Sequence, residues 1–144
     1  MYRETGCLTS PDFIREIRAV TSDTLQYVVN DLFEEITLYE NRAVSADYCQ
    51  IGANKYEVNL TVFCKKFRAD SVGNQSEIPL NDYITIAVLG ENNRELYLKK
   101  HKINRNHTKL AIMVDEKPVK AGIDPYCILV DRTWDDNIIS LTNF

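Results

Sequence analysis

Histidine, glycine and long apolar runs are all scarce in this chain, and each shortage removes a class of function. Only two histidines occur, His101 and His107, and no H-E-x-x-H pair is present, which argues against a catalytic zinc held by this chain alone. The five dispersed glycines form no phosphate-cradling loop. The longest apolar stretch, at residues 84–89, has the length of a strand, so we expect no direct membrane insertion.

Nucleophile motifs and closely spaced cysteines are missing as well. No G-x-S-x-G segment occurs in the chain. The four cysteines are too widely separated for a zinc knuckle or a redox motif: Cys7, Cys49, Cys64 and Cys127. We expect buried or free thiols, and a disulfide is the alternative if the domain lies outside the cytoplasm. The sequence therefore offers no catalytic, cofactor-binding or strongly metal-binding residue.

The charge of the chain is unevenly distributed. The net charge is −4, which argues against a nucleic-acid partner because phosphate affinity requires clustered Lys and Arg. Residues 1–38 carry three basic and seven acidic side chains, whereas residues 39–144 carry fourteen of each. This asymmetry predicts a change of organisation near residue 38, with a helical segment at 1–38 and a second unit at 39–144.

Two amphipathic helices are predicted before residue 38. Ser10 suits the N-cap of the first helix, and Pro11 suits its first helical position, where the missing N–H of proline has no cost. The second helix is expected to begin after Thr21 or Ser22 and to carry an apolar stripe: Leu25, Val28, Val29, Leu32, Phe33 and Ile36. Such a stripe needs an apolar surface, in this chain or in a neighbouring domain. For an interdomain contact we select Leu25, Val29, Leu32 and Phe33.

After residue 38 the apolar period changes from that of a helix to that of a strand. Alternation at 55–65, 82–89, 94–103 and 109–115 predicts half-buried strands, and 37–44 and 128–132 supply further ones. Turn-forming clusters separate them, with no helical pattern between. We therefore predict a mainly β fold, an antiparallel, immunoglobulin-like β-sandwich of six to seven strands. The basic run at 99–102 is interpreted as an edge strand whose lysines discourage unwanted pairing.

The stretch "AGIDPYCILVDRTWDDN", residues 121–137, is rich in aspartate and has three readings. The first is structural: Gly122, Asp124 and Pro125 form a turn, because proline restricts φ and aspartate bonds the backbone ahead. The second is a cation site. Its candidate ligands lie at the end of the stretch: Asp131, Asp135 and Asp136. Calcium loops of the EF-hand type also need a glycine and a terminal glutamate, which are missing here. Catalysis is the third and least supported reading, since adjacent acids on a strand point apart.

The same stretch carries a family resemblance. Together with "TLQYVVNDLFEEITLYENR", "YEVNLTVFCKKFRADSVGN" and "ELYLKKHKI", it resembles the C-terminal end of bacterial membrane proteins that combine an ABC-transporter-permease-like region with a zinc aminopeptidase of the aminopeptidase N type (a gluzincin). The resemblance covers about residues 10–137. It implies that the zinc and the catalytic residues belong to a peptidase region outside this chain, because the family's zinc motif matches nothing here. Cys127 and Ile128 depart from the polar residues expected at that turn.

These observations lead to three functional hypotheses. The leading one is a non-catalytic accessory domain that packs against the peptidase and membrane domains of the same longer polypeptide, on the periplasmic face of the inner membrane. In it, residues 1–38 are the last part of the peptidase region. The alternative is a stand-alone extracytoplasmic module that binds peptide or carbohydrate through an exposed aromatic cluster: Tyr83, Tyr97, Tyr126 and Trp134. The third is a small hydrolase in its own right.

Overall fold

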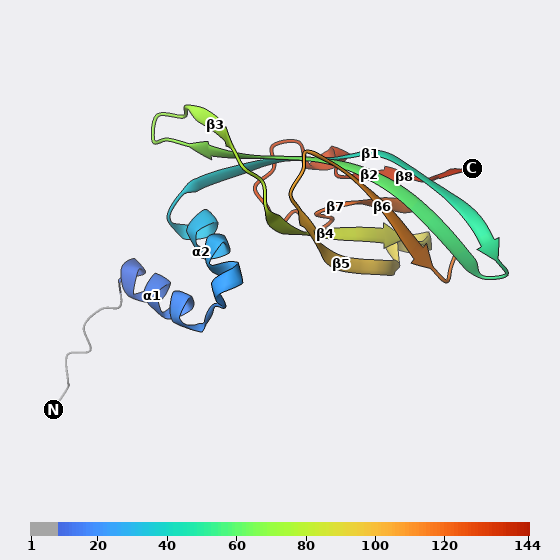
Figure 1. Ribbon diagram of the computed structural model, residues 1–144, viewed down its shortest axis with the longest axis horizontal. Coiled ribbons are helices and arrows are strands. Elements are labelled where there is room, and N and C mark those ends of the chain that lie inside the picture. The colour runs from blue at the N-terminus through green and yellow to red at the C-terminus, as the bar shows by residue number, and fades with distance from the viewer. Residues whose placement is uncertain (1–8) are drawn as a thin grey trace.

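The computed structural model describes residues 9–144, and this part of the chain is mainly β, with two short helices at its start (Figure 1). The helices are α1 (Ser10–Val20) and α2 (Gln26–Phe33). The strands are β1 (Ile36–Gly52), β2 (Lys55–Ala69), β3 (Gln75–Ile78), β4 (Asp82–Leu89), β5 (Glu95–Ile103), β6 (His107–Val114), β7 (Lys120–Ile123), β8 (Ile138–Ser140) and β9 (Thr142–Asn143). Short 3-10 turns lie at Asp23–Leu25, Glu91–Asn93 and Trp134–Asp136.

The strands form two sheets, as a β-sandwich requires. One sheet has the order β3-β2-β1-β9, with β6 also paired to β2, and the other has the order β5-β4-β7-β8. Long β1 and β2 form an antiparallel hairpin that runs along the molecule (Figure 1). The described pairs are antiparallel except for β1 and β9, which run parallel. The predicted wholly antiparallel arrangement is therefore wrong at this short C-terminal strand.

The hydrophobic core lies between the two sheets and follows the predicted alternation. Val58, Leu60 and Val62 of β2 are fully or almost fully buried, and they belong to the face that the sequence pattern selects. From the other sheet, β4 contributes Ile84 and Ile86, which are equally buried. Successive side chains of a strand point to opposite faces, so an apolar residue at every second position builds one continuous inner layer.

Three expectations about local structure are wrong. The second helix does not reach Ile36, because α2 ends at Phe33 and Ile36 pairs with Ala69 in the β1–β2 ladder. Residues 128–132 form no strand; an isolated bridge joins Asp131 to Tyr39. The residues described contain nine strands rather than six to seven. The strands outside the predicted ranges are β3, β7, β8 and β9, which have only two to four residues each and give too short a pattern to recognise.

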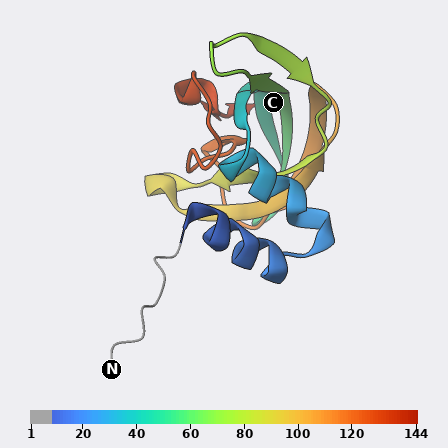
Figure 2. The same ribbon diagram turned by 90° about the vertical axis from the view of Figure 1, so that its left-hand side faces the viewer.

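The helical segment lies at one end of the sandwich. Seen from that end, α1 and α2 lie in front of the sheets (Figure 2). The N-cap of α1 is Thr9 rather than the predicted Ser10, and its backbone N–H and hydroxyl both donate to Asp12. Arg18 of α1 contacts Glu34 across 2.6 Å. Within residues 9–144, no helix combines the length and the apolar character needed to cross a bilayer.

Candidate functional site

Four charged side chains meet where α2 joins the sandwich, and we call them the ion-pair cluster: Asp31, Lys66, Arg68 and Asp82. Lys66 Nζ lies 2.5 Å from an oxygen of Asp31 and 2.8 Å from an oxygen of Asp82. Arg68 reaches the other Asp31 oxygen at 2.8 Å. The Lys66, Asp31 and Asp82 side chains are only 5–6% exposed. The cluster therefore joins three elements: α2, β2 and β4.

The strand pattern places two members of this cluster in the interior. Lys66 continues the buried face of β2, two residues beyond buried Cys64, and Asp82 begins the buried face of β4, two residues before Ile84. A buried charge is tolerated only when it is paired, because water no longer solvates it. The two residues pair with each other across the two sheets. Sequence reasoning missed the cluster, although a lysine and an aspartate in phase with apolar faces were the available signal.

Two tyrosines border the cluster. The Tyr39 hydroxyl donates to Asp82 across 2.5 Å, and burial together with this carboxylate raises the pKa of Tyr39 far above its ordinary value. Lys66 Nζ lies 5.2 Å from the centre of the Tyr27 ring and 5.7 Å from that of Tyr39. Burial raises the pKa of Tyr27 as well. Both phenols therefore remain protonated at neutral pH. With its charges mutually paired, the cluster holds elements together and presents no free acid, base or nucleophile.

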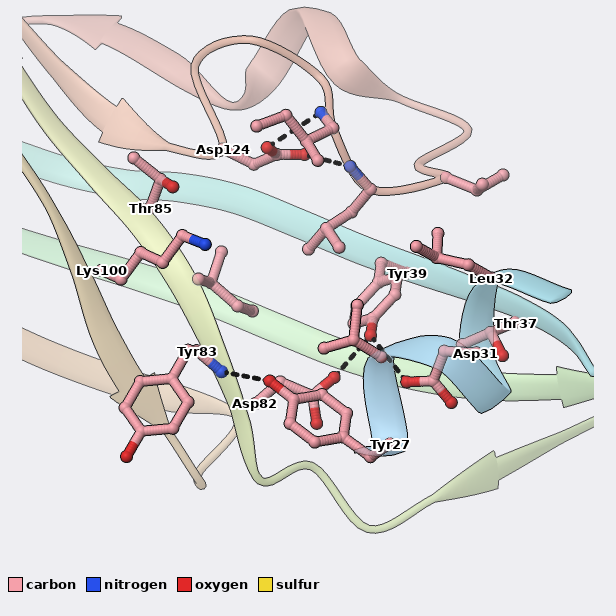
Figure 3. A pocket seen from close by; sticks show the side chains of 15 residues that line it. Tyr27, Asp31, Leu32, Thr37, Tyr39, Asp82, Tyr83, Thr85, Lys100 and Asp124 are labelled. Carbon is pink, nitrogen blue, oxygen red and sulfur yellow. Dashed lines mark hydrogen bonds between the residues drawn. The ribbon is translucent and has the colours of Figure 1, made fainter. Parts of the chain in front are cut away.

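A pocket of about 120 Å³ opens beside the cluster, between α2, β4 and residues 124–130 (Figure 3). Its apolar wall is formed by Val28, Leu32, Ile84, Ile128, Leu129 and Val130. Its polar lining comprises Tyr27, Asp31, Thr37, Tyr39, Asp82, Tyr83, Thr85, Lys100 and Asp124. An engineered apolar cavity of similar size, about 150 Å³, accepts a benzene molecule in another protein. The pocket is therefore large enough for one ring or one branched side chain.

Of the predicted turn residues, Asp124 lines this pocket. Asp124 has φ of 45°, and its two carboxylate oxygens accept the N–H groups of Ile128 and Leu129, each at 3.0 Å. These two donors are thereby used by a side chain, which explains why no strand forms at 128–132. Pro125 follows in the turn itself. Gly122 lies in β7, where an added Cβ would be 2.0 Å from the backbone oxygen of Asn137. The predicted turn thus has a hydrogen-bonding basis at Asp124, whereas the prediction is wrong for Gly122, which lies in strand β7 before the turn.

The three cation candidates do not converge on one point. Asp131 accepts the backbone N–H groups of Asn41 at 2.9 Å and of Thr133 at 3.0 Å, so it serves as a backbone acceptor. Asp135 is exposed. One Asp136 oxygen is buried without a partner, and burial and then the charge of Asp131 raise the pKa of Asp136. Within residues 9–144, no group of three or more acidic, histidine or cysteine side chains is arranged to hold a metal ion.

The residues selected for an interdomain contact are mostly exposed. Leu25, Leu32 and Phe33 expose 39%, 55% and 45% of their surface, whereas Val29 is buried within this chain. Phe13 of α1 is 57% exposed and packs edge-on against Phe33, with 6.0 Å between ring centres. The helical segment thus presents an apolar surface that the described residues do not cover. We call it the helical patch, and it consists of Phe13, Leu25, Leu32 and Phe33.

The aromatic residues selected for a binding module do not all share one environment. Tyr83, Tyr126 and Trp134 are exposed, but Tyr97 packs against the core. Among residues 9–144, no two of these four rings form an aromatic pair. The basic run at 99–102 lies on β5, which is an edge strand of its sheet as interpreted from the sequence.

The cysteines and the two histidines form no shared site in the described part of the chain. Cys49, Cys64 and Cys127 are free thiols, and Cys7 lies outside the described residues. Burial raises the pKa of the Cys64 thiol, which donates to Asn41. His101 bonds to the Tyr97 hydroxyl at 2.7 Å, while the ring of His107 packs on Phe63.

Comparison with protein-family models, curated proteins and solved structures gives no match.

Proposed function

We propose that this chain is a non-catalytic accessory domain that docks onto a neighbouring domain through the helical patch. The observation that carries this proposal is the exposure of Phe13 on α1, Leu25 in the 3-10 turn, and Leu32 and Phe33 on α2. The two helices lie at one end of the sandwich (Figure 2). Complete burial of one such side chain contributes about 1.5–3 kcal/mol, so four partly exposed ones supply several kcal/mol on docking. Exposed apolar side chains gathered in one region mark an interaction site in many proteins.

The ion-pair cluster links the docking helices firmly to the sandwich. Asp31 of α2 forms ion pairs with Lys66 and Arg68 of β2. A partner that binds the helices would therefore also fix the orientation of the sandwich. In this proposal, residues 1–38 are continuous with a preceding peptidase region, and residues 39–144 are an immunoglobulin-like accessory unit.

The family resemblance extends the proposal to a parent protein. In that parent, a membrane-anchored permease region and a zinc aminopeptidase precede this domain, and the domain lies on the periplasmic face of the inner membrane. The zinc and the catalytic residues belong to the peptidase region. We assign no catalytic, cofactor or metal role to any residue of this chain.

The first test is the full reading frame of the gene, which should encode an H-E-x-x-H segment and several membrane spans upstream. The encoded peptidase region is then expressed separately, and its binding to this chain is measured by calorimetry. A Leu32→Ser/Phe33→Ser variant should bind at least tenfold more weakly. Ile51→Ser is the matched control, because Ile51 is 52% exposed on the distant β1–β2 hairpin (Figure 1). Equal binding by both variants would refute docking through the helical patch.

The alternative is a stand-alone module that binds peptide or carbohydrate. The exposure of Tyr83, Tyr126 and Trp134 supports it, since such rings provide stacking surfaces. It predicts that the isolated chain binds an oligosaccharide or peptide ligand, and that Trp134→Ala removes the binding. The accessory-domain proposal instead predicts that Trp134→Ala leaves binding to the peptidase region unchanged.

A further inference from the structure

The pocket beside α2 is built for an apolar group. Leu32 and residues 128–130 form much of its wall, and Leu32, Ile128 and Val130 also expose more than half of their surface at its rim. Its volume of about 120 Å³ suits a branched chain of four to six carbons or a single ring, by analogy with the benzene-binding cavity. Larger ligands would need the helix to move.

The acceptor groups in the pocket are already engaged by this chain. Asp31 contacts Lys66 and Arg68, and Asp82 accepts from Tyr39 and Lys66. Asp124 accepts two backbone N–H groups, as described above. Each carboxylate in the pocket thus already faces a cation or N–H donors of this chain, which argues against an amine. Asp31 Oδ1 is the least engaged oxygen, because it lies 2.8 Å from Arg68 but forms no hydrogen bond with residues 9–144.

Several side chains of the lining donate no hydrogen bond to residues 9–144: the hydroxyls of Tyr27, Thr37, Tyr83 and Thr85 and the ammonium of Lys100. Of these, Thr85 and Lys100 lie next to each other. Thr85 of β4 and Lys100 of β5 line the pocket, and they are directly opposite each other in the β4–β5 ladder. Side chains directly opposite on neighbouring strands lie on one face of the sheet, so the hydroxyl and the ammonium form an adjacent pair. Figure 3 shows Lys100 extending toward the pocket beside Thr85. A hydroxyl and an ammonium side by side are suited to bind one carboxylate.

We propose that this pocket binds a small apolar carboxylate, with its branched or aromatic end against the apolar wall and its carboxylate on Lys100 and Thr85. The apolar wall provides affinity and the donor pair selects the charged group. Asp124 is an anion in the same pocket, but both of its oxygens face the loop N–H groups. The pocket shares Leu32 with the helical patch, but Lys100 and Thr85, which hold the carboxylate, lie outside that patch, so the Lys100 variant tests this site separately from docking.

The test is a titration of the intact chain with 4-methylpentanoate, followed by backbone amide NMR shifts. We expect saturable shifts at millimolar ligand for residues 128–130 and for α2. Lys100→Gln should weaken binding about two- to fivefold, the range typical of an exposed ion pair. Lys99→Gln is the matched control, since Lys99 is also exposed but lies on the opposite face of β5. It should bind like the wild type.

A neutral ligand of the same shape distinguishes the contribution of the apolar wall from that of the donor pair Lys100 and Thr85. For 4-methylpentan-1-ol, Lys100→Gln should not change the affinity, because the alcohol carries no charge. N-acetyl-leucine tests the source of the carboxylate: tighter binding than 4-methylpentanoate assigns the site to a peptide C-terminus, and weaker binding assigns it to a free acid. Absence of shifts at residues 128–130, or equal loss in the Lys99 and Lys100 variants, would overturn the proposal. Lys100 is exposed, so its variant tests binding without unfolding the chain.

Discussion

Lys66 of β2 and Asp82 of β4 form an ion pair between the two sheets, with 2.8 Å from Nζ to the nearer carboxylate oxygen. Both side chains are about 5% exposed, and Asp31 contacts the same ammonium from α2. Removal of one partner from a buried pair leaves an uncompensated charge, which typically costs about 3–5 kcal/mol. We predict that Lys66→Met lowers the free energy of unfolding by this amount, measured by urea denaturation.

The preceding residue provides the control for this prediction. Lys65 contacts Glu77 at 3.0 Å, but both side chains are substantially exposed. An exposed pair contributes about 0–1 kcal/mol, because water screens it. Lys65→Met should therefore change stability by less than about 1 kcal/mol. If the two variants lost equal stability, the buried ion pairs of Lys66 would contribute no more to folding than an exposed pair does.

The second prediction concerns Asp124, whose two oxygens accept the N–H groups of Ile128 and Leu129. Asp124→Ala removes both bonds and places alanine at a positive φ of 45°. Hydrogen bonds to charged groups contribute about 1.5–3 kcal/mol each, so loss of both should lower the free energy of unfolding by about 3–6 kcal/mol. Hydrogen exchange should accelerate at the amides of Ile128 and Leu129.

Asp124→Asn is the matched variant for the same site. Asparagine keeps one acceptor oxygen and tolerates a positive φ, so it should retain part of the stability. A loss as large as that of Asp124→Ala would show that the charge and the second acceptor oxygen, rather than the tolerance of a positive φ, are responsible.

The third prediction concerns Gly122, where the backbone of residues 137–138 approaches closely. A Cβ there would lie 2.0 Å from the Asn137 oxygen and 2.8 Å from the Ile138 Cα. Because backbone atoms cannot rotate away, the β7–β8 pair must separate. Gly122→Ala should lower stability by about 3 kcal/mol or more, in a thermal melt or by denaturant.

Gly52 provides the comparison for this effect. Its added Cβ would meet Lys55 at an ordinary 3.5 Å. Gly52→Ala should change stability by no more than about 0.5 kcal/mol. A mild effect of Gly122→Ala would mean that β8 does not pair closely with β7.

The fourth prediction is a pH dependence at Asp136, whose pKa is raised by burial and by the charge of Asp131. The folded state binds this proton more readily than the unfolded state, so stability falls as pH rises from the ordinary pKa of 3.8 through the raised value. Asp136→Asn should raise the melting temperature at neutral pH and have little effect below about pH 3.9. Asp135→Asn, at an exposed position, should change the pH profile less than Asp136→Asn does, because the charge of Asp135 raises the pKa of Asp136 less than burial and Asp131 do.

Much of the β-sheet structure could be predicted from the sequence because strand burial is encoded locally. Val58, Leu60 and Val62 alternate with polar residues, and this pattern alone assigns one face of β2 to the core. The same reasoning extends to Lys66 and Asp82, which keep the phase of their apolar neighbours. Their burial could not be predicted, because a charged residue in phase with a buried face is expected inside only when its ion-pair partner is known.

The candidate sites depended on contacts between distant residues, which no local pattern specifies. The pocket brings together Leu32 of α2, Thr85 and Lys100 of neighbouring strands, and residues 128–130. Ile36 continues a helical stripe in the sequence, but its pairing with Ala69 places it in β1.

The sequence by itself determined where apolar and polar faces alternate, where the turn at Asp124 begins, and that two helices precede the strands. Only the tertiary structure decided that Asp31, Lys66 and Asp82 meet, that residues 128–132 leave the sheet, and that Thr85 and Lys100 face one pocket. The physical reason is that periodicity reports which side of an element is buried, whereas strand register and the packing of α2 decide which buried groups become neighbours.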